Sequence, residues 1–294
     1  MYPSRLITLL LVTLSIGLAG TAPAQEDDRS GEREKMIELG LQHESAWDLY
    51  QTLVEEADGG QPMTWENMPD WTGVYGRTKG GLAFDPDDPT QGFAMPAAKF
   101  TPEYHAMLVK AFEDLQNGIE YDPLSQCAPP GYPRWLDMPF LREFIVRPEQ
   151  TTMIAEAFNS VRRIYTDGRD HLPEEYQYPE ENGDSIGVWD GQKLITHTNM
   201  LMAHMYERSQ GFYSDQVEGV EIWEKIDDET LIAHAWIYDP PALEEPWYTR
   251  QSYTLLDDPD KLLRIGHWEC KGNQNNEVIE TEDGGSTFTD FTFD

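Results

Sequence analysis

The chain has 294 residues and is strongly acidic, with 54 Asp and Glu against 21 Lys and Arg and a formal net charge of −33. A field of this sign repels nucleic acid and anionic membrane surfaces, so we expect neither as a partner. The length allows one large or two small domains with a sizeable core.

The first 24 residues have the pattern of an export signal. Arg5 is followed by an uncharged apolar run from Leu6 to Ala19, and Ala22-Pro23-Ala24 is a small-x-small cleavage pattern. This apolar run is shorter than the roughly 20 residues that span a bilayer. We therefore expect residues 1–24 to be a cleaved signal peptide, and the mature protein to be periplasmic or secreted without membrane insertion.

Helical patterns occur in two places. From Gly31 to about Glu56 apolar residues recur at helical spacing, which assigns 25–69 as an N-terminal helical segment. Near 101–117, Thr101 is a good N-cap, Pro102 suits the first helical position and one apolar stripe follows. We interpret this second helix as an insertion in a single domain of residues 70–294.

Short strand-like runs dominate the rest of the chain. One is expected at Trp71–Tyr75, before a long loop over 76–100, and most follow Asp137. The later runs are Glu143–Arg147, Thr151–Ala157, Val161–Thr166, Ser185–Trp189, Lys193–Thr198, Glu218–Lys225, Leu231–Tyr238 and Tyr248–Leu255. Short connections, such as those at Asp190-Gly191 and Asp227-Asp228, require antiparallel neighbours. A sandwich is one way to hide the sheet edges, but we favour a mainly β fold with an antiparallel lipocalin-like barrel and two or more flanking α-helices.

The two cysteines, Cys127 and Cys270, are most simply explained as one disulfide in an exported chain, with two unpaired buried thiols as the alternative. Signatures for phosphate loops, nucleophile elbows and metal sites are absent, and the seven histidines form no close ligand pair. We therefore expect neither a metal nor a cofactor.

Ionisable residues in otherwise apolar strands are the candidate catalytic groups: Arg162, Glu221 and His234, with His171 beyond the turn at Asp167-Gly168. A carboxylate, an imidazole and a guanidinium in one aromatic cavity could transfer a proton and stabilise an oxyanion. The alternative is a structural Arg–Glu pair with a hydrogen-bonded histidine. Candidate substrate-binding residues are Arg134, Tyr165, Trp189, Trp236 and His197.

Several stretches together resemble a widespread group of secreted bacterial proteins, mostly of unassigned function. The matching stretches are D-W-T-G-V-Y (70–75), T-P-E-Y (101–104), C-A-P-P-G-Y-P-R (127–134), R-R-I-Y-T-D-G-R-D-H (162–171), G-D-S-I-G-V-W-D-G (183–191) and D-P-P-A-L-E-E-P-W (239–247). Where the group often has an acid after the D-G hairpin, this chain has His197. The G-V-Y run also resembles a reduced form of the first-strand motif of lipocalins.

Some proteins of this general kind resemble enzymes that degrade lignin-derived aromatic dimers by cofactor-independent loss of formaldehyde. The resemblance implies a periplasmic lyase or isomerase acting on a small aromatic molecule, with His234 or Glu221 as the base and Arg162 or His171 stabilising a departing phenoxide. A non-catalytic lipocalin-like carrier of a small apolar ligand is the alternative, and an envelope interaction protein is a third. A homodimer remains open.

Overall fold

The computed structural model describes residues 29–79, 98–206, 211–258, 263–270 and 278–288. The expected signal peptide and most of the expected 76–100 loop lie outside these residues. The predicted N-terminal helical stretch is two helices, α1 (Arg29–Leu41) and α2 (Ala46–Glu56). The two helices are separate because Ser45 caps the start of α2. Its hydroxyl accepts a hydrogen bond from the Asp48 amide at 3.1 Å.

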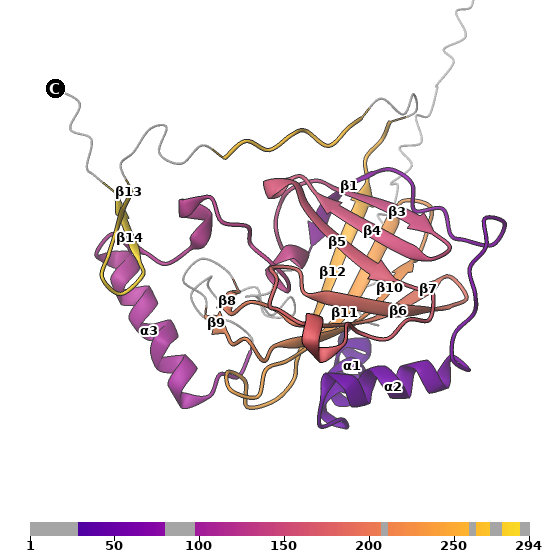
Figure 1. The fold of residues 1–294 in the computed structure, drawn as a ribbon, viewed down its shortest axis with the longest axis horizontal. Helices are drawn as coiled ribbons and strands as arrows, with labels where there is room; N and C mark the ends of the chain where they lie inside the picture. Colours follow the sequence, from indigo (N-terminus) through magenta and orange to yellow (C-terminus); the bar gives the residue numbers. More distant parts are fainter. Residues whose placement is uncertain (1–28, 80–97, 207–210, 259–262, 271–277, 289–294) are drawn as a thin grey trace, which may run out of the picture.

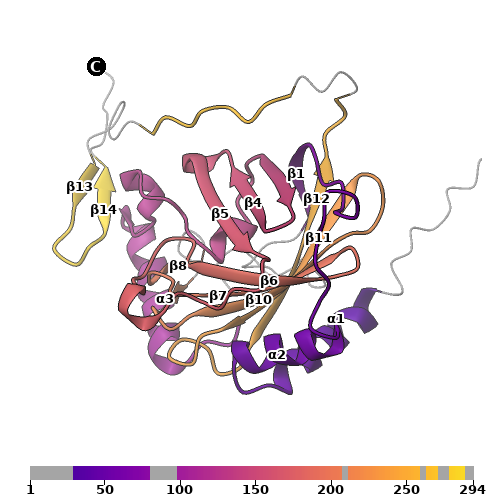
Figure 2. The same cartoon turned by 45° about the vertical axis from the view of Figure 1, so that its right-hand side comes forward.

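The second predicted helix is confirmed as α3 (Pro102–Gln116), with Pro102 at its start. In Figures 1 and 2, α3 lies to one side of the barrel, whereas α1 and α2 pack against the barrel wall. No helix among the described residues is long and apolar enough to cross a membrane.

A closed barrel of nine strands forms the body of the described chain, which confirms the mainly β, barrel-like prediction. Each of the eight predicted runs after Asp137 falls largely within a strand. The strands are β1 (Val74–Lys79), β3 (Arg142–Arg147), β4 (Gln150–Ala155), β5 (Ser160–Tyr165), β6 (Asp184–Asp190), β7 (Lys193–Asn199), β10 (Glu218–Lys225), β11 (Thr230–Tyr238) and β12 (Trp247–Leu255). The strand expected at Trp71–Tyr75 instead begins at Val74.

The barrel order is β1-β12-β11-β10-β7-β6-β5-β4-β3, and β3 closes onto β1. The expectation of purely antiparallel pairing is wrong at one position, because β5 and β6 pair in parallel through Ile164↔Ser185 and Tyr165↔Ile186. A parallel pair needs a crossover connection, and residues 166–183 supply it. The pairing covers only the end of β5, so the first half of that strand is not paired with β6.

Aromatic side chains fill much of the barrel interior. Trp71, Phe144, Trp189, Trp223 and Tyr253 are almost fully buried and lie with neighbouring ring centroids 5.2–6.2 Å apart. Aromatic pairs at such separations add to the free energy of burial. The interior is therefore substantially a packed core.

The segment that follows Cys127 closes one part of this core. Tyr132, Trp135 and Leu136 are completely buried, and the Tyr132 amide donates a hydrogen bond to the Glu181 carbonyl at 2.7 Å. Gly219 of β10 makes room for the Tyr132 ring, since a Cβ there would lie 2.0 Å from the Tyr132 hydroxyl oxygen.

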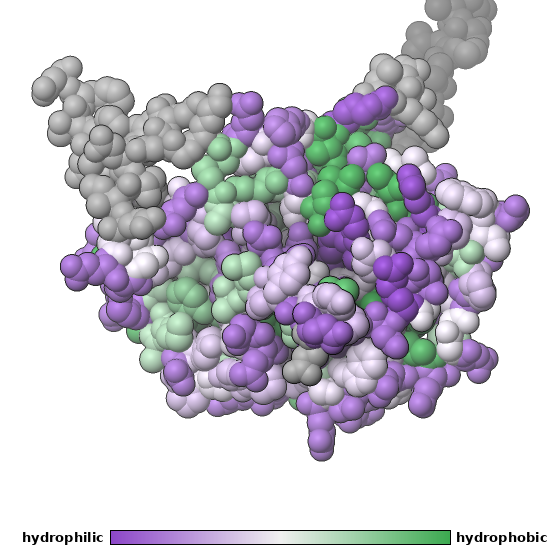
Figure 3. Space-filling view, viewed as in Figure 1, coloured by the Kyte–Doolittle hydropathy of each residue, from purple (hydrophilic) through white to green (hydrophobic). Residues whose placement is uncertain are grey.

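Two smaller sheets complete the fold. One has the order β13-β14-β2, formed by Val278–Glu280, Ser286–Phe288 and Ile119–Glu120, and the other pairs β8 (His204–Met205) with β9 (Phe212–Tyr213). The predicted disulfide between Cys127 and Cys270 is present, with Cα atoms 5.6 Å apart. It joins the C-terminal part of the chain to the Tyr132 segment. Hydrophilic residues dominate the face in Figure 3, in keeping with the acidic composition.

Candidate functional site

Two predicted catalytic residues, Arg162 of β5 and Glu221 of β10, meet inside the barrel. Their side chains are 1% and 0% exposed, and the two guanidinium nitrogens of Arg162 lie 3.0 and 2.6 Å from the two Glu221 carboxylate oxygens. Their mutual attraction, strengthened by these bidentate contacts, compensates for the cost of removing both charges from water.

Neighbouring hydroxyls satisfy the rest of this ion pair. Thr196 donates to Glu221 at 2.9 Å, and Arg162 donates to Thr198 at 2.7 Å. The Arg162 guanidinium also lies 4.4 Å from the centroid of the Tyr132 ring. Arg162 and Glu221 thus bind each other and neighbouring side chains of the barrel wall. This arrangement matches the structural Arg–Glu pair that the sequence analysis gave as the alternative to a catalytic role.

His234 does not join this pair, so the predicted convergence of three groups is wrong. In the β10–β11 ladder Glu221 lies opposite Ala235, whereas His234 lies opposite Ile222. Because residues directly opposite share a face, Glu221 points inward and His234 outward. On the outer face His234 hydrogen-bonds the Tyr248 hydroxyl at 2.7 Å.

Trp236 and His234 share this outer face. Trp236 is buried under α1, where its indole nitrogen donates to the Met36 carbonyl at 2.6 Å. Burial, followed by the positive charge of Arg250, lowers the pKa of His234 to about 4. The His234 imidazole is therefore neutral at neutral pH, and Trp236 has a packing role beneath α1.

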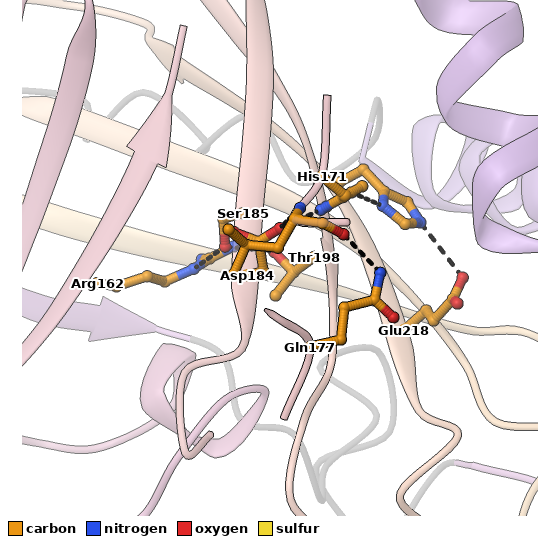
Figure 4. A network of polar contacts seen from close by, with 9 residues as sticks. Arg162, His171, Gln177, Asp184, Ser185, Thr198 and Glu218 are labelled. Carbon is orange, nitrogen blue, oxygen red and sulfur yellow. Dashed lines mark hydrogen bonds and ion pairs between the residues drawn. The ribbon is translucent and has the colours of Figure 1, made fainter. Parts of the chain in front are cut away.

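The other two predicted histidines form a continuous polar chain on the outer face of the barrel (Figure 4). His171 Nδ1 lies 2.7 Å from an Asp184 carboxylate oxygen, and His171 Nε2 lies 2.7 Å from His197 Nδ1. His197 Nε2 in turn lies 3.3 Å from a Glu218 carboxylate oxygen. We call His171 and His197 the histidine pair. The two ends of the polar chain are the carboxylates of Asp184 on β6 and Glu218 on β10.

The histidine pair is covered by α2. The ring of Trp47 lies 5.1 Å from that of His197 in an edge-on arrangement, and Tyr50 lies 5.6 Å from it. Burial lowers the pKa of His197, although the nearby Glu218 carboxylate acts in the opposite direction. Burial raises the pKa of Asp184, but hydrogen bonds from His171 and the Leu172 amide outweigh this effect and the net pKa is lowered.

A pocket of about 360 Å³ lies where β5 separates from β6, beside the crossover connection. This volume is near the lower end of the range for small-molecule sites. Its lining is rich in ionisable, polar and aromatic groups, among them Arg163, Tyr165, Gln177, Tyr178 and Asp184. Asp184 therefore belongs both to the pocket wall and to the chain of hydrogen bonds that contains the histidine pair.

The two adjacent arginines of β5 have different positions. Arg162 points inward to Glu221, and Arg163, with Tyr165, lies on the outward face of the strand. Arg163 is exposed at the pocket and has no ion-pair partner in the part of the chain that the structure describes. Tyr165 carries the Arg169 guanidinium 4.0 Å from its ring centroid. Arg163 is thus the cation available to a bound anion.

The remaining predicted binding residues lie elsewhere. Arg134 is buried in a bidentate ion pair with Asp122, at 2.7 and 2.9 Å, and Trp189 packs against Trp71 in the barrel core. Of the predicted site residues, the pocket wall contains Tyr165 and a part of Arg162, and the histidine pair is linked to it through Asp184.

Three residues of this site, Asp184, Arg163 and Gln177, were not predicted from the sequence. Asp184 lies within the G-D-S-I-G stretch, whose polar residue at the start of a strand was the available signal. The described residues contain no group of three or more His, Cys, Asp or Glu side chains arranged to hold a metal ion. No protein-family model matches the chain, and no curated protein matches it.

Proposed function

We propose that this protein is a cofactor-independent lyase or isomerase that acts on a small aromatic molecule bound in the pocket beside β5. One observation carries the proposal: Asp184 combines a place in the pocket wall with an ionised carboxylate supported by the histidine pair. A carboxylate held in this way can act as a general base.

The other pocket groups suit an aromatic substrate with an anionic or developing anionic oxygen. Tyr165 and Tyr178 are aromatic residues of the pocket wall, and Arg163 offers a guanidinium that has no ion-pair partner among the described residues. A positioned cation stabilises negative charge that develops in a transition state. The base role, predicted for His234 or Glu221, thus passes to Asp184. The anion-stabilising role, predicted for Arg162 or His171, passes to Arg163.

In the specific reaction suggested by the resemblance, the substrate carries a hydroxymethyl group and a phenoxy leaving group on neighbouring carbons. Asp184 takes the hydroxyl proton, and the O–H electron pair forms the carbonyl of formaldehyde. The broken carbon–carbon bond supplies the electrons of a new carbon–carbon double bond, and the phenoxide departs with its own electron pair. Arg163 stabilises the phenoxide, which finally takes the proton from Asp184.

A lipocalin-like carrier calls for an apolar cavity with one polar anchor. The aromatic packing of the barrel interior and the ionisable lining of the pocket favour the enzyme over the carrier. The disulfide is compatible with folding in an oxidising compartment, and we retain the periplasm as the proposed location.

The test is a screen of aromatic dimers with and without a hydroxymethyl group, using protein from residue 25 onward with a chelator and no added nucleotide. We expect formaldehyde release from hydroxymethyl substrates, and a 10²–10³-fold lower kcat in Arg163→Gln, as for the loss of one oxyanion donor. Arg147→Gln is the matched control, because Arg147 is exposed at the end of β3 and does not line the pocket. An absence of turnover across the panel, or full activity of Arg163→Gln, would contradict the proposal.

A further inference from the structure

The polar chain that starts at Asp184 continues away from the pocket and ends at a partly exposed carboxylate. Glu218, the first residue of β10, is 36% exposed, whereas His197 is 2% exposed. Figure 4 shows Glu218 on the far side of His171 from Arg162. The chain thus joins a pocket carboxylate to a surface carboxylate through two imidazoles.

Counting hydrogen atoms defines the charge of this chain. Each of its three contacts needs one hydrogen atom between the two heavy atoms, and an ionised carboxylate can only accept. With Asp184 and Glu218 both ionised, the three contacts require three N–H hydrogens on the histidine pair. Two neutral imidazoles carry only two, so the pair holds one extra proton.

The surroundings favour one location for that proton. The His171 side chain is 11% exposed against 2% for His197, and its carboxylate contact is the shorter of the two, at 2.7 Å against 3.3 Å, so we place the extra proton on His171, next to Asp184. The other ionisable groups of this region include Asp170, the residue directly before His171, and Tyr50 on α2, whose pKa burial and Asp170 raise to about 12. Arg169 is a further one, and its positive charge acts on Asp184. Asp184 and Glu218 are the carboxylates in direct contact with the histidine pair, at 2.7 and 3.3 Å, and stabilise an imidazolium there.

We infer that Glu218 and His197 are positioning residues that keep His171 protonated and so hold the pocket carboxylate Asp184 ionised and oriented. Removing the negative charge of Glu218 removes the need for the third N–H, because a glutamine amide at this position can donate to His197 Nε2. His197 then donates from Nδ1 to His171, and both rings become neutral. The pocket base loses its cationic neighbour without any change in the pocket itself. The catalytic part of this inference rests on the proposed function, but the proton count does not.

The first measurement is the number of N–H hydrogens on His171 and His197, obtained from imidazole ¹⁵N NMR shifts at pH 7. We expect three in the wild-type protein and two in Glu218→Gln. Glu224→Gln is the matched control, since Glu224 lies on the outer face of the same strand and pairs with Lys193. It should retain three. Two hydrogens in the wild type, or three in Glu218→Gln, would overturn the inference.

The second measurement uses a substrate identified in the screen. Glu218→Gln should move the acidic limb of the kcat/KM pH profile to higher pH, because Asp184 loses a neighbouring positive charge, while Glu224→Gln leaves the profile unchanged. An unchanged profile in Glu218→Gln would overturn the positioning role. If the proton count changes as expected but no substrate is turned over, the proposed function fails while the coupling stands. If turnover depends on Arg163 and the count is two in the wild type, the coupling fails while the function stands.

Discussion

The buried ion pair gives the sharpest stability prediction. Arg162→Met strands the Glu221 carboxylate, which is fully buried and keeps the Thr196 hydroxyl as a hydrogen-bond donor. Glu221→Met strands the Arg162 guanidinium, which retains Thr198 and Ser185. Removing one partner of a buried pair leaves an uncompensated charge and costs about 3–5 kcal/mol, so we expect each single variant to lose this much unfolding free energy.

The double variant Arg162→Met/Glu221→Met leaves no charge stranded. Replacing both partners by apolar groups of similar volume is often neutral or stabilising, so we expect it to be more stable than either single variant by at least ~3 kcal/mol. Denaturant unfolding with the disulfide intact gives the three free energies. Single variants within about 1 kcal/mol of wild type, or a double variant that costs the sum of the two, would contradict this prediction.

Three other predictions concern the wall and the closure of the barrel. Gly219→Ala places a Cβ 2.0 Å from the Tyr132 hydroxyl and should cost about 1–3 kcal/mol in denaturant unfolding, with a changed near-ultraviolet spectrum; an unaltered protein would show that Tyr132 does not occupy this position. His234 binds a proton less readily in the folded than in the unfolded state, so its contribution to stability is complete above pH 6.5 and is lost as the pH falls towards 4. That loss is roughly 3 kcal/mol and should be absent in His234→Gln, and parallel pH curves for the two proteins would contradict it. The disulfide Cys127–Cys270 joins residues 143 positions apart in the sequence, and its reduction should destabilise the protein by ~5 kcal/mol in the chain-entropy model. An unchanged midpoint of thermal unfolding would argue against this contribution.

The strands after Asp137 were predictable because alternating apolar residues and turn signals repeat along the chain. The parallel β5–β6 pair was not predictable from these signals, because the crossover contains no long helical pattern that would mark it. The closed barrel followed from counting short connections. The pairing of β1 with β3, which closes the barrel, could not be predicted because the two strands are distant in sequence.

The site was predicted less well, for reasons of register. A two-residue turn at Asp227-Asp228 would pair Glu221 with His234, whereas the observed ladder starts with Lys225↔Leu231 and places them on opposite faces. A slip of one residue moves a side chain to the other face of a sheet. On β5 the alternation of residues did not show which of Arg162 and Arg163 faces inward, and the candidate cation predicted from the sequence was Arg162. The meeting of His171 with His197 depends on how the crossover folds, which local sequence patterns do not determine.

We propose Asp184 as the base of a reaction in the pocket beside β5. The most direct test is the rate of formaldehyde release by Asp184→Asn at saturating substrate, beside wild type and the control Asp190→Asn, whose exposed side chain ends the same strand outside the pocket. We predict that Asp184→Asn is slower by about 10²–10⁴-fold with its fold intact, and that Asp190→Asn equals wild type. Wild-type turnover by Asp184→Asn would contradict it.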